Sequence, residues 1–161
     1  MIPQGTHIPV LTSIGKLFPE IKSVMEYGSG ECSTLTFLNR NIFPNLERLV
    51  STESQAQWAH EMSKRVNGDP RWTLILDDET DPAADVDLIF VDSLTGESRV
   101  RTLEKMLTTN FQGIVVCHDS QEPYYRVALP KFPFRYNFPQ YIPNTAIVSI
   151  RHIPKLEEVR I

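Results

Sequence analysis

Residues 24–34, VMEYGSGECST, decide the fold that we expect for this chain. Their first part is short and apolar or aromatic apart from one acid, which is typical of a buried strand, and a turn of small residues follows at 28–30. A helix start then falls near Ser33. A strand that runs through a glycine turn into a helix is the repeating unit of a parallel sheet covered by helices. Because glycine allows positive φ and a close approach to the bare backbone, this turn is also the first place to look for a bound ligand.

Seven short runs along the chain have the length, the apolar content and the flanking turn residues of strands. They are residues 23–27, 48–52, 72–76, 87–92, 113–117, 134–138 and 145–151. Apolar residues at helical spacing predict helices at 9–18, 33–41, 55–66 and 96–107, and a further helical segment at 121–129.

The order of these elements predicts the topology. Strands that alternate with helices form a parallel sheet with helices on both faces. The last two strands are joined only by residues 139–144, which are too few for a crossover helix, so we expect an antiparallel pair. The predicted fold is α/β, a doubly wound, mostly parallel seven-stranded sheet with a C-terminal antiparallel hairpin. We expect a single domain over 1–161, with a short N-terminal helical cap (1–22), βα units (23–129) and a terminal hairpin and tail (130–161).

Composition and charge narrow the class of function. With 161 residues, 41% of them hydrophobic and 22% charged, the chain fits one globular domain. The formal net charge of −4 argues against nucleic acid or an anionic membrane as the main partner, because both reward dense Lys and Arg. We see no targeting segment and no run approaching about 18 apolar residues. Cys32 and Cys117 are too few for a disulfide scaffold, so we expect a reduced, cytoplasmic setting.

Three kinds of site compete for the turn at 28–30. A Walker-type phosphate loop requires a lysine, which this stretch lacks. A dinucleotide turn requires G-x-G-x-x-G, and Ser33 stands at the position of the last glycine. An S-adenosylmethionine turn places an acid two residues before the first glycine, where this chain has Glu26. A carboxylate there suits the cationic amino-acid end of that cofactor and would repel a pyrophosphate.

Four stretches in the right order carry a resemblance to a known family. They are residues 24–34 (VMEYGSGECST), 49–58 (LVSTESQAQW), 86–99 (VDLIFVDSLTGESR) and 113–125 (GIVVCHDSQEPYY). On these motifs the chain resembles the class I, Rossmann-like S-adenosylmethionine-dependent methyltransferases, and among them the small O-methyltransferase-like members. The resemblance spans residues 25–151, nearly the whole chain, and the terminal hairpin is also what this family has.

The resemblance implies a cofactor site along the carboxyl edge of the sheet. Glu53, at the end of the second strand, would accept hydrogen bonds from the ribose hydroxyls, as an acid at this position would also do in a dinucleotide site. Asp77 or Asp78 would face the adenine amino group, unless this acidic loop is simply solvated. The cofactor-binding residues implied in this way are Glu26, Tyr27, Gly28, Ser29, Gly30, Ser33, Thr34, Glu53, Ser54, Asp77, Asp78 and Asp92.

The candidate catalytic residues are Asp92, His118 and Asp119, which end the fourth and fifth strands and should converge on one rim of the sheet. Methyl transfer mainly requires that the nucleophile be aligned and lose its proton. His118, with an ordinary pKa of ~6.5, suits that removal, and the alternative is a residue that only orients its neighbours. Asp92 and Asp119 could instead hold Mg²⁺. The metal-dependent branch of the family has an Asp-Asn pair where this chain has His118-Asp119, so we predict no metal.

Several neighbouring residues have two readings. Tyr124 and Tyr125 could line an acceptor pocket as substrate contacts, or one of them could pack on the sheet. Arg99 is expected to face solvent or to pair locally. We expect His7, like the two remaining histidines outside the motifs, to be a surface or packing residue.

Together these features predict an enzyme that moves the methyl group of S-adenosylmethionine to an oxygen or nitrogen atom of an unidentified acceptor, a small molecule or a macromolecule. Only residues 6–9 and 130–143 remain to cover the acceptor, so a non-catalytic binding or assembly domain with the same sheet is the first alternative. An NAD-dependent oxidoreductase is disfavoured by Glu26, by Ser33 and by the terminal hairpin. Self-association into a homo-oligomer stays open.

Overall fold

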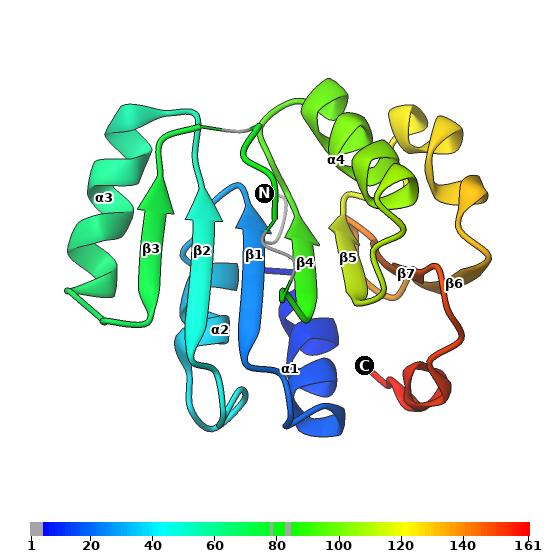
Figure 1. Cartoon of the computed structure of the whole chain (residues 1–161), viewed down its shortest axis with the longest axis horizontal. Helices are drawn as coiled ribbons and strands as arrows, with labels where there is room; N and C mark the ends of the chain where they lie inside the picture. Colours follow the sequence, from blue (N-terminus) through cyan, green and yellow to red (C-terminus); the bar gives the residue numbers. More distant parts are fainter. Residues whose placement is uncertain (1–4, 78, 83–84) are drawn as a thin grey trace.

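A sheet of seven strands forms the centre of the fold (Figure 1). The computed structural model describes residues 5–77, 79–82 and 85–161. The strands are β1 (Ser23–Tyr27), β2 (Arg48–Thr52), β3 (Trp72–Ile75), β4 (Leu88–Val91), β5 (Ile114–His118), β6 (Phe134–Phe138) and β7 (Thr145–Ser149). Their spatial order is β3-β2-β1-β4-β5-β7-β6, and β7 is antiparallel to both β5 and β6 while the other neighbours pair in parallel. The predicted doubly wound, mostly parallel sheet with a C-terminal antiparallel pair is confirmed.

The described residues also form four α-helices and three short 3-10 helices. They are α1 (Ile8–Leu17), α2 (Ser33–Leu38), α3 (Ala56–Val66) and α4 (Gly96–Thr108), with 3-10 helices at Pro123–Val127, Leu129–Lys131 and Pro154–Glu158. The helix predicted at 121–129 is replaced by the first two 3-10 helices. Pro123 starts the first of them at a position that tolerates proline, whereas Pro130 lacks the N–H that continuing an α-helix past residue 129 would need. Between β3 and β4 the described residues contain no helix, and none of the predicted helices falls there. Nowhere in the described ranges is there a helix long and apolar enough to cross a membrane.

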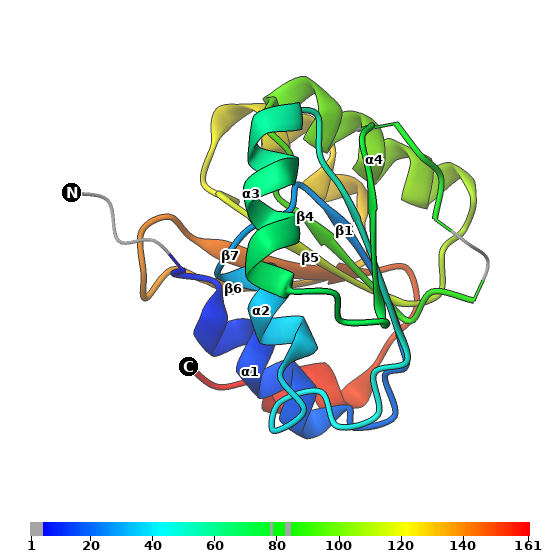
Figure 2. The same cartoon turned by 90° about the vertical axis from the view of Figure 1, so that its left-hand side faces the viewer.

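Helices cover both faces of the sheet, and alternation along the strands decides what faces each layer. Val24 belongs to the apolar core shared with α1 and α2, whereas Met25 and Tyr27 belong to the core shared with α4. Figure 2 shows α1 and α2 on one side of the sheet and α4 on the other. The four residues of β4 are buried, as expected for a strand covered on both faces.

The carboxyl ends of the parallel strands meet along one edge, the upper edge in Figure 1. Register places Tyr27 opposite both Thr52 and Val91, and Val91 opposite Cys117. The residues that follow these ends therefore line a common edge. The chain leaves β1 toward β2 and β3, then returns to β4 on the other side, which makes β1 and β4 the switch point where ligands bind in open α/β sheets.

Candidate active site

Gly28 is the first residue beyond β1, and its backbone conformation leaves no room for a side chain. Its φ is +91°, in the region that favours glycine, and a Cβ would lie 2.4 Å from the Asp92 carbonyl oxygen. The amides of Gly28 and Ser29 both donate to the Thr52 carbonyl at 3.1 Å. The turn is therefore held between the ends of β2 and β4, with bare backbone at the switch point.

Glu26 lies behind this turn and is fully buried. Its Oε2 accepts hydrogen bonds from the hydroxyls of Thr34, at 2.7 Å, and Ser51, at 2.5 Å, while its Oε1 has no hydrogen-bond partner in the described structure. Burial raises the pKa of Glu26 to about 7, although hydrogen bonds from Ser33, Ser51 and Thr34 oppose the rise. Thr34 Oγ1 also accepts from the Gly30 amide at 3.1 Å. Hydrogen bonds thus connect Glu26, the turn and the first residues of α2. Within this network Ser33 and Thr34 of α2 fix the Glu26 carboxyl group in the interior.

Glu53 follows β2 and faces the same turn. Its side chain is mostly buried, with Oε2 accepting from Ser29 Oγ at 3.2 Å and Oε1 accepting from the Gln55 amide at 2.8 Å. Trp58 Nε1 donates to the Ser29 carbonyl at 2.7 Å, so Ser29 is held from two sides. The adjacent Ser54 is exposed.

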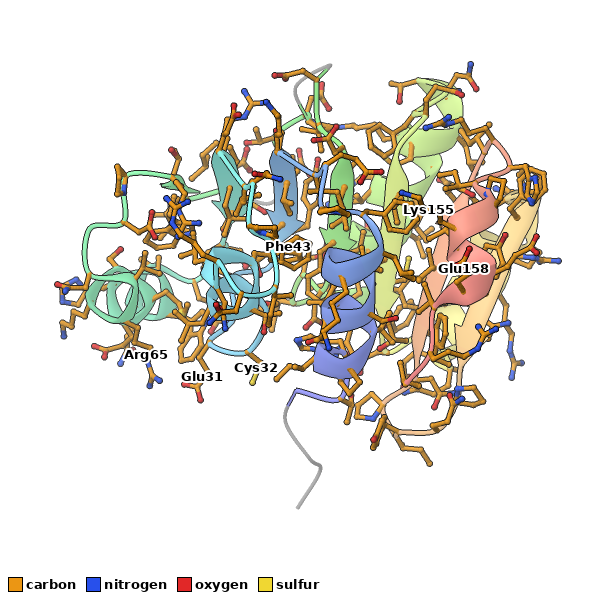
Figure 3. All side chains as sticks on the ribbon, turned by 90° about the horizontal axis from the view of Figure 1, so that it is seen from below. Glu31, Cys32, Phe43, Arg65, Lys155 and Glu158 are labelled. Atoms are coloured by element: carbon orange, nitrogen blue, oxygen red, sulfur yellow. The ribbon has the colours of Figure 1, made fainter. Side chains whose placement is uncertain are left out.

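The loop after Gly30 is tied to α3 at the surface. Glu31 forms an ion pair with Arg65 of α3, and Cys32, a free and half-buried cysteine, lies beside it (Figure 3). A Cβ built on Gly5 would lie 3.1 Å from Cys32 Sγ. The segment that precedes α1 therefore passes next to the turn that follows β1.

The end of β3 carries an acidic loop. Asp77 is exposed and accepts from the Glu79 amide at 3.0 Å and from Thr80 Oγ1 at 2.9 Å. The hydroxyl of Tyr27 donates to the Thr80 carbonyl at 2.8 Å, and burial raises the pKa of Tyr27. The hydroxyl of Tyr27 thus anchors this loop. Asp78, the other predicted adenine contact, lies outside the described residues.

Arg99 organises the other half of the edge, whereas the sequence predicted that it faces solvent or pairs locally; it is buried and pairs with Asp92 and with the distant Asp119. Its Nη2 lies 2.8 Å from Asp92 Oδ1 and its Nη1 lies 2.5 Å from Asp119 Oδ2. Its Nε donates to the Ser93 carbonyl at 2.6 Å, and the residue is only 7% exposed. A signal in the sequence could have found it, because Arg99 shares the buried face of α4 with Leu103 and Met106 at helical spacing.

This guanidinium also decides the question of Mg²⁺ between the two aspartates. Arg99 occupies the position between Asp92 and Asp119 and neutralises one oxygen of each. A hard cation held by the same pair would face a positive charge within bonding distance of its ligands. The residues present do not fit a Mg²⁺ ion there.

His118 ends β5 and faces both aspartates. Its Nδ1 lies 3.2 Å from Asp92 Oδ1 and 3.7 Å from Asp119 Oδ1, but the alignment makes neither a hydrogen bond, and Nδ1 is buried without a hydrogen-bond partner among the described residues. Its Nε2 shares a hydrogen bond of 2.9 Å with Thr6 Oγ1. Asp119 adopts a φ of +56°, in the left-handed region that few residues with side chains enter, although Asp and Asn do so more readily than most.

His7 also lies beside His118, although no sequence pattern around His7 predicted this. Its ring centre lies 4.6 Å from that of His118 and 5.0 Å from that of Phe90, and the residue is 4% exposed. Burial, with a smaller effect of His118, lowers the pKa of His7 to about 3. The imidazole is therefore neutral at physiological pH.

The two candidate acceptor tyrosines occupy different environments. Tyr124 is half-buried, and its hydroxyl lies 3.2 Å from Arg99 Nη1, next to the two aspartates. Tyr125 is 1% exposed within the core, where burial raises the pKa of its hydroxyl. Tyr124 lies where an acceptor could touch it, whereas the packing alternative describes Tyr125.

Comparison with known proteins places this geometry in context. No family model matches the chain, and no curated protein matches it either. Solved structures do match: a methyltransferase from Geobacter sulfurreducens (14% identity, TM-score 0.62, 94% of this chain and 82% of that one), a putative rRNA-methylase from Clostridium thermocellum (15%, 0.59, 89% and 97%) and the spermidine synthase from Thermotoga maritima (18%, 0.66, 97% and 62%). This chain spans less than two thirds of that spermidine synthase.

At these identities the likeness concerns the fold alone. The chain has the class I, Rossmann-like methyltransferase fold, with the reversed seventh strand between the fifth and the sixth. The family resemblance read from the sequence motifs is confirmed at this level. The roles of the individual site residues remain predictions.

Proposed function

We propose that this protein is an S-adenosylmethionine-dependent methyltransferase that acts on an oxygen or nitrogen atom of its acceptor. The observation that carries the proposal is the bare turn at Gly28, flanked by the carboxylates of Glu53 after β2 and Asp92 after β4. This arrangement lies at the switch point of the sheet, where a nucleoside cofactor binds in folds of this class.

The residues present fit this cofactor. Each oxygen of Glu53 accepts one hydrogen bond from the protein, and a carboxylate oxygen can accept two, so both can still receive a ribose hydroxyl. The backbone of residues 28–30 would cradle the amino-acid end. Glu26 Oε1 is a buried acceptor without a partner, and a cationic amino group or a water that it holds would satisfy it. Asp77, with the exposed Ser54, lies farther along the edge toward the adenine end.

The other half of the edge would receive the acceptor. The cofactor supplies a methyl group on a sulfonium, so the protein has only to align the nucleophile and take its proton. If His118 Nε2 carries the hydrogen and donates it to Thr6, the lone pair of Nδ1 is free to take that proton. Asp92, fixed by Arg99, would then stabilise the imidazolium that His118 becomes when it has taken the proton.

The alternatives are less well supported. An NAD-dependent oxidoreductase would bring a pyrophosphate to the turn in front of the buried acid Glu26. A non-catalytic domain would have no use for the buried ion pairs of Arg99 with Asp92 and Asp119. We further propose a cytoplasmic protein, supported by the free thiols of Cys32 and Cys117, whose main partner is not nucleic acid, supported by the net charge of −4.

The test is calorimetric titration with S-adenosylmethionine, S-adenosylhomocysteine and NAD⁺. We expect the first two to bind and NAD⁺ not to bind. Glu53→Ala should weaken binding by at least about tenfold, the loss of one or two hydrogen bonds to a charged group. Glu158→Ala is the matched control, because Glu158 is exposed on the last 3-10 helix, which lies below the sheet in Figure 1, at the end opposite the carboxyl edge.

Binding of S-adenosylmethionine would then justify an acceptor screen by release of S-adenosylhomocysteine, with His118→Gln as the variant that loses the base. Binding without turnover on any acceptor would favour the non-catalytic alternative. Absence of binding by either cofactor form would refute the proposal.

A further inference from the structure

Three side chains from distant parts of the chain bring potential metal ligands together at the carboxyl edge. His7 precedes α1, Asp92 follows β4 and His118 ends β5. Each offers one ligand atom, and these atoms all lie within 4.8 Å of one another. At this separation two imidazoles and a carboxylate are close enough to bind one metal ion together.

The polar atoms of this set are not satisfied by the protein. Neither ring nitrogen of His7 has a hydrogen-bond partner among the described residues, and His118 Nδ1 also lacks one, although all three atoms are buried. An unsatisfied buried polar group is costly, and each one in a folded protein calls for an explanation. A bound ion would satisfy one nitrogen of each ring at once.

We propose that His7, Asp92 and His118 bind a divalent first-row transition metal ion of the Zn²⁺ type, with the remaining coordination positions open to an oxygen ligand at the carboxyl edge. Imidazole nitrogen suits zinc and its neighbours in the first row, whereas Mg²⁺ and Ca²⁺ prefer oxygen ligands. This donor set therefore differs in chemistry and in position from the pair Asp92 and Asp119.

The surrounding residues arrange the ligands for this task. A hydrogen bond from His118 Nε2 to Thr6 Oγ1 would fix the ring so that Nδ1 keeps its lone pair and faces Asp92, as second contacts commonly do for metal-binding histidines. Asp92 Oδ1 lies 2.8 Å from Arg99 Nη2 and 3.2 Å from His118 Nδ1, so the carboxylate lies directly beside one of the two histidine ligands.

The local charge also suits a cation. Asp92 and Asp119 carry two negative charges and Arg99 one positive charge. The region therefore has a net negative charge before an ion enters. Arg99 bridges the two carboxylates, with one guanidinium nitrogen on each.

The site does not depend on the proposed methyl transfer, and metal binding is measured without any cofactor. The two proposals share Asp92 and His118. Asp92 flanks the cofactor turn in one and is a metal ligand in the other, and His118 Nδ1 can be a proton acceptor or a metal ligand but not both. In the metal-bound state a hydroxyl on the ion would ionise more readily, which would replace the base.

The experiment is titration of the whole chain with Zn²⁺ by calorimetry, and with Co²⁺ followed by its visible absorption. A Cys32→Ser background removes the partly exposed thiol, which could otherwise bind these ions. His7→Gln and His118→Gln test the ligands. His152→Gln is the control, because His152 is exposed and pairs with Glu157 elsewhere on the surface.

We expect one Zn²⁺ per chain, affinity reduced by at least about tenfold in each ligand variant and unchanged in the control, and no competition from Mg²⁺. Circular dichroism of the metal-free variants shows whether they fold. If a variant does not fold, X-ray absorption of the Co²⁺ form of the otherwise unaltered protein decides, since the proposal requires two imidazole nitrogens on the metal. Failure to bind one ion per chain, binding that survives both histidine changes, or a spectrum without imidazole would overturn it.

Discussion

The buried acid Glu26 gives a quantitative prediction about stability and pH. Burial raises its pKa from 4.5 to about 7, so the folded chain holds a proton on Glu26 that the unfolded chain has released. The stability that this proton contributes is fully present below pH 4.5 and is lost as the pH rises to about 7. A shift of this size corresponds to about 3 kcal/mol in the free energy of unfolding.

The perturbation is Glu26→Gln, which keeps the shape of the side chain but cannot ionise. Glutamine can still accept from Ser51 and Thr34, so the variant should fold. Measured by urea denaturation, the stability of the variant relative to the unaltered protein should rise by about 3 kcal/mol between about pH 4.5 and 8. Other carboxyl groups affect both proteins equally and cancel in the difference.

Glu158→Gln is the control, because an exposed carboxyl should give a difference that does not change with pH. A flat difference for Glu26→Gln as well would refute the reasoning. It would mean that Glu26 ionises normally in the folded chain, with its Oε1 solvated rather than left without a partner.

Three further predictions concern the same edge. Binding of S-adenosylmethionine near pH 7 should release a proton as the cationic cofactor favours the charged form of Glu26, detected by calorimetry in buffers of different ionisation enthalpy; equal apparent enthalpies would contradict it. Gly28→Ala should cost at least about 2 kcal/mol more in thermal unfolding than Gly68→Ala, because both glycines have positive φ but only Gly28 has backbone in contact; equal costs would count against the clash. Arg99→Met should destabilise the chain by about 3 to 5 kcal/mol by leaving two carboxylates unpaired, against less than about 1 for the exposed Arg101→Met.

Most of the fold could be predicted because its signals are local. Strands of apolar residues bounded by turns gave the bounds of β1, β2 and β6 without error, and the length of the last connection gave the reversed β7. The prediction of one helical segment at 121–129 was wrong, since the chain forms two short 3-10 helices there and Pro130 cannot donate within a longer α-helix. The ends of parallel strands also brought Glu53, Asp92 and His118 to one edge, as expected from topology.

The rest of the site depends on contacts that no local pattern carries. Thr6 and His118 share a hydrogen bond across 112 positions of the sequence, so nothing near His7 announces that it lies over the end of β5. The sequence also did not indicate whether the Glu26 side chain points toward the turn or into the core. Glu26 stands one residue before the end of β1, and the hydroxyls of Thr34 and Ser51 hold it behind the turn rather than in front of it.

Features that lower the stability of the folded chain are concentrated at the carboxyl edge of the sheet. This concentration indicates a functional site without reference to any similar protein. Among the described residues, the buried polar atoms without partners include those of His7, Glu26, Thr52, His118 and Thr145, and register places Thr52 and Thr145 at the same strand ends. The left-handed conformation of Asp119 and the buried charge of Arg99 lie there too.

Stability alone would not produce this concentration. A buried ion pair often stabilises a protein less than apolar residues of the same volume would, and strained residues persist where the surrounding structure has a use for them. Perturbed ionisable groups likewise cluster where chemistry occurs. The same reasoning applies to His7, whose neutral ring is buried at the end of β5 without a hydrogen-bond partner among the described residues. A ligand at this edge, whether cofactor, acceptor or metal, is the simplest physical reason for such a group of residues to remain together.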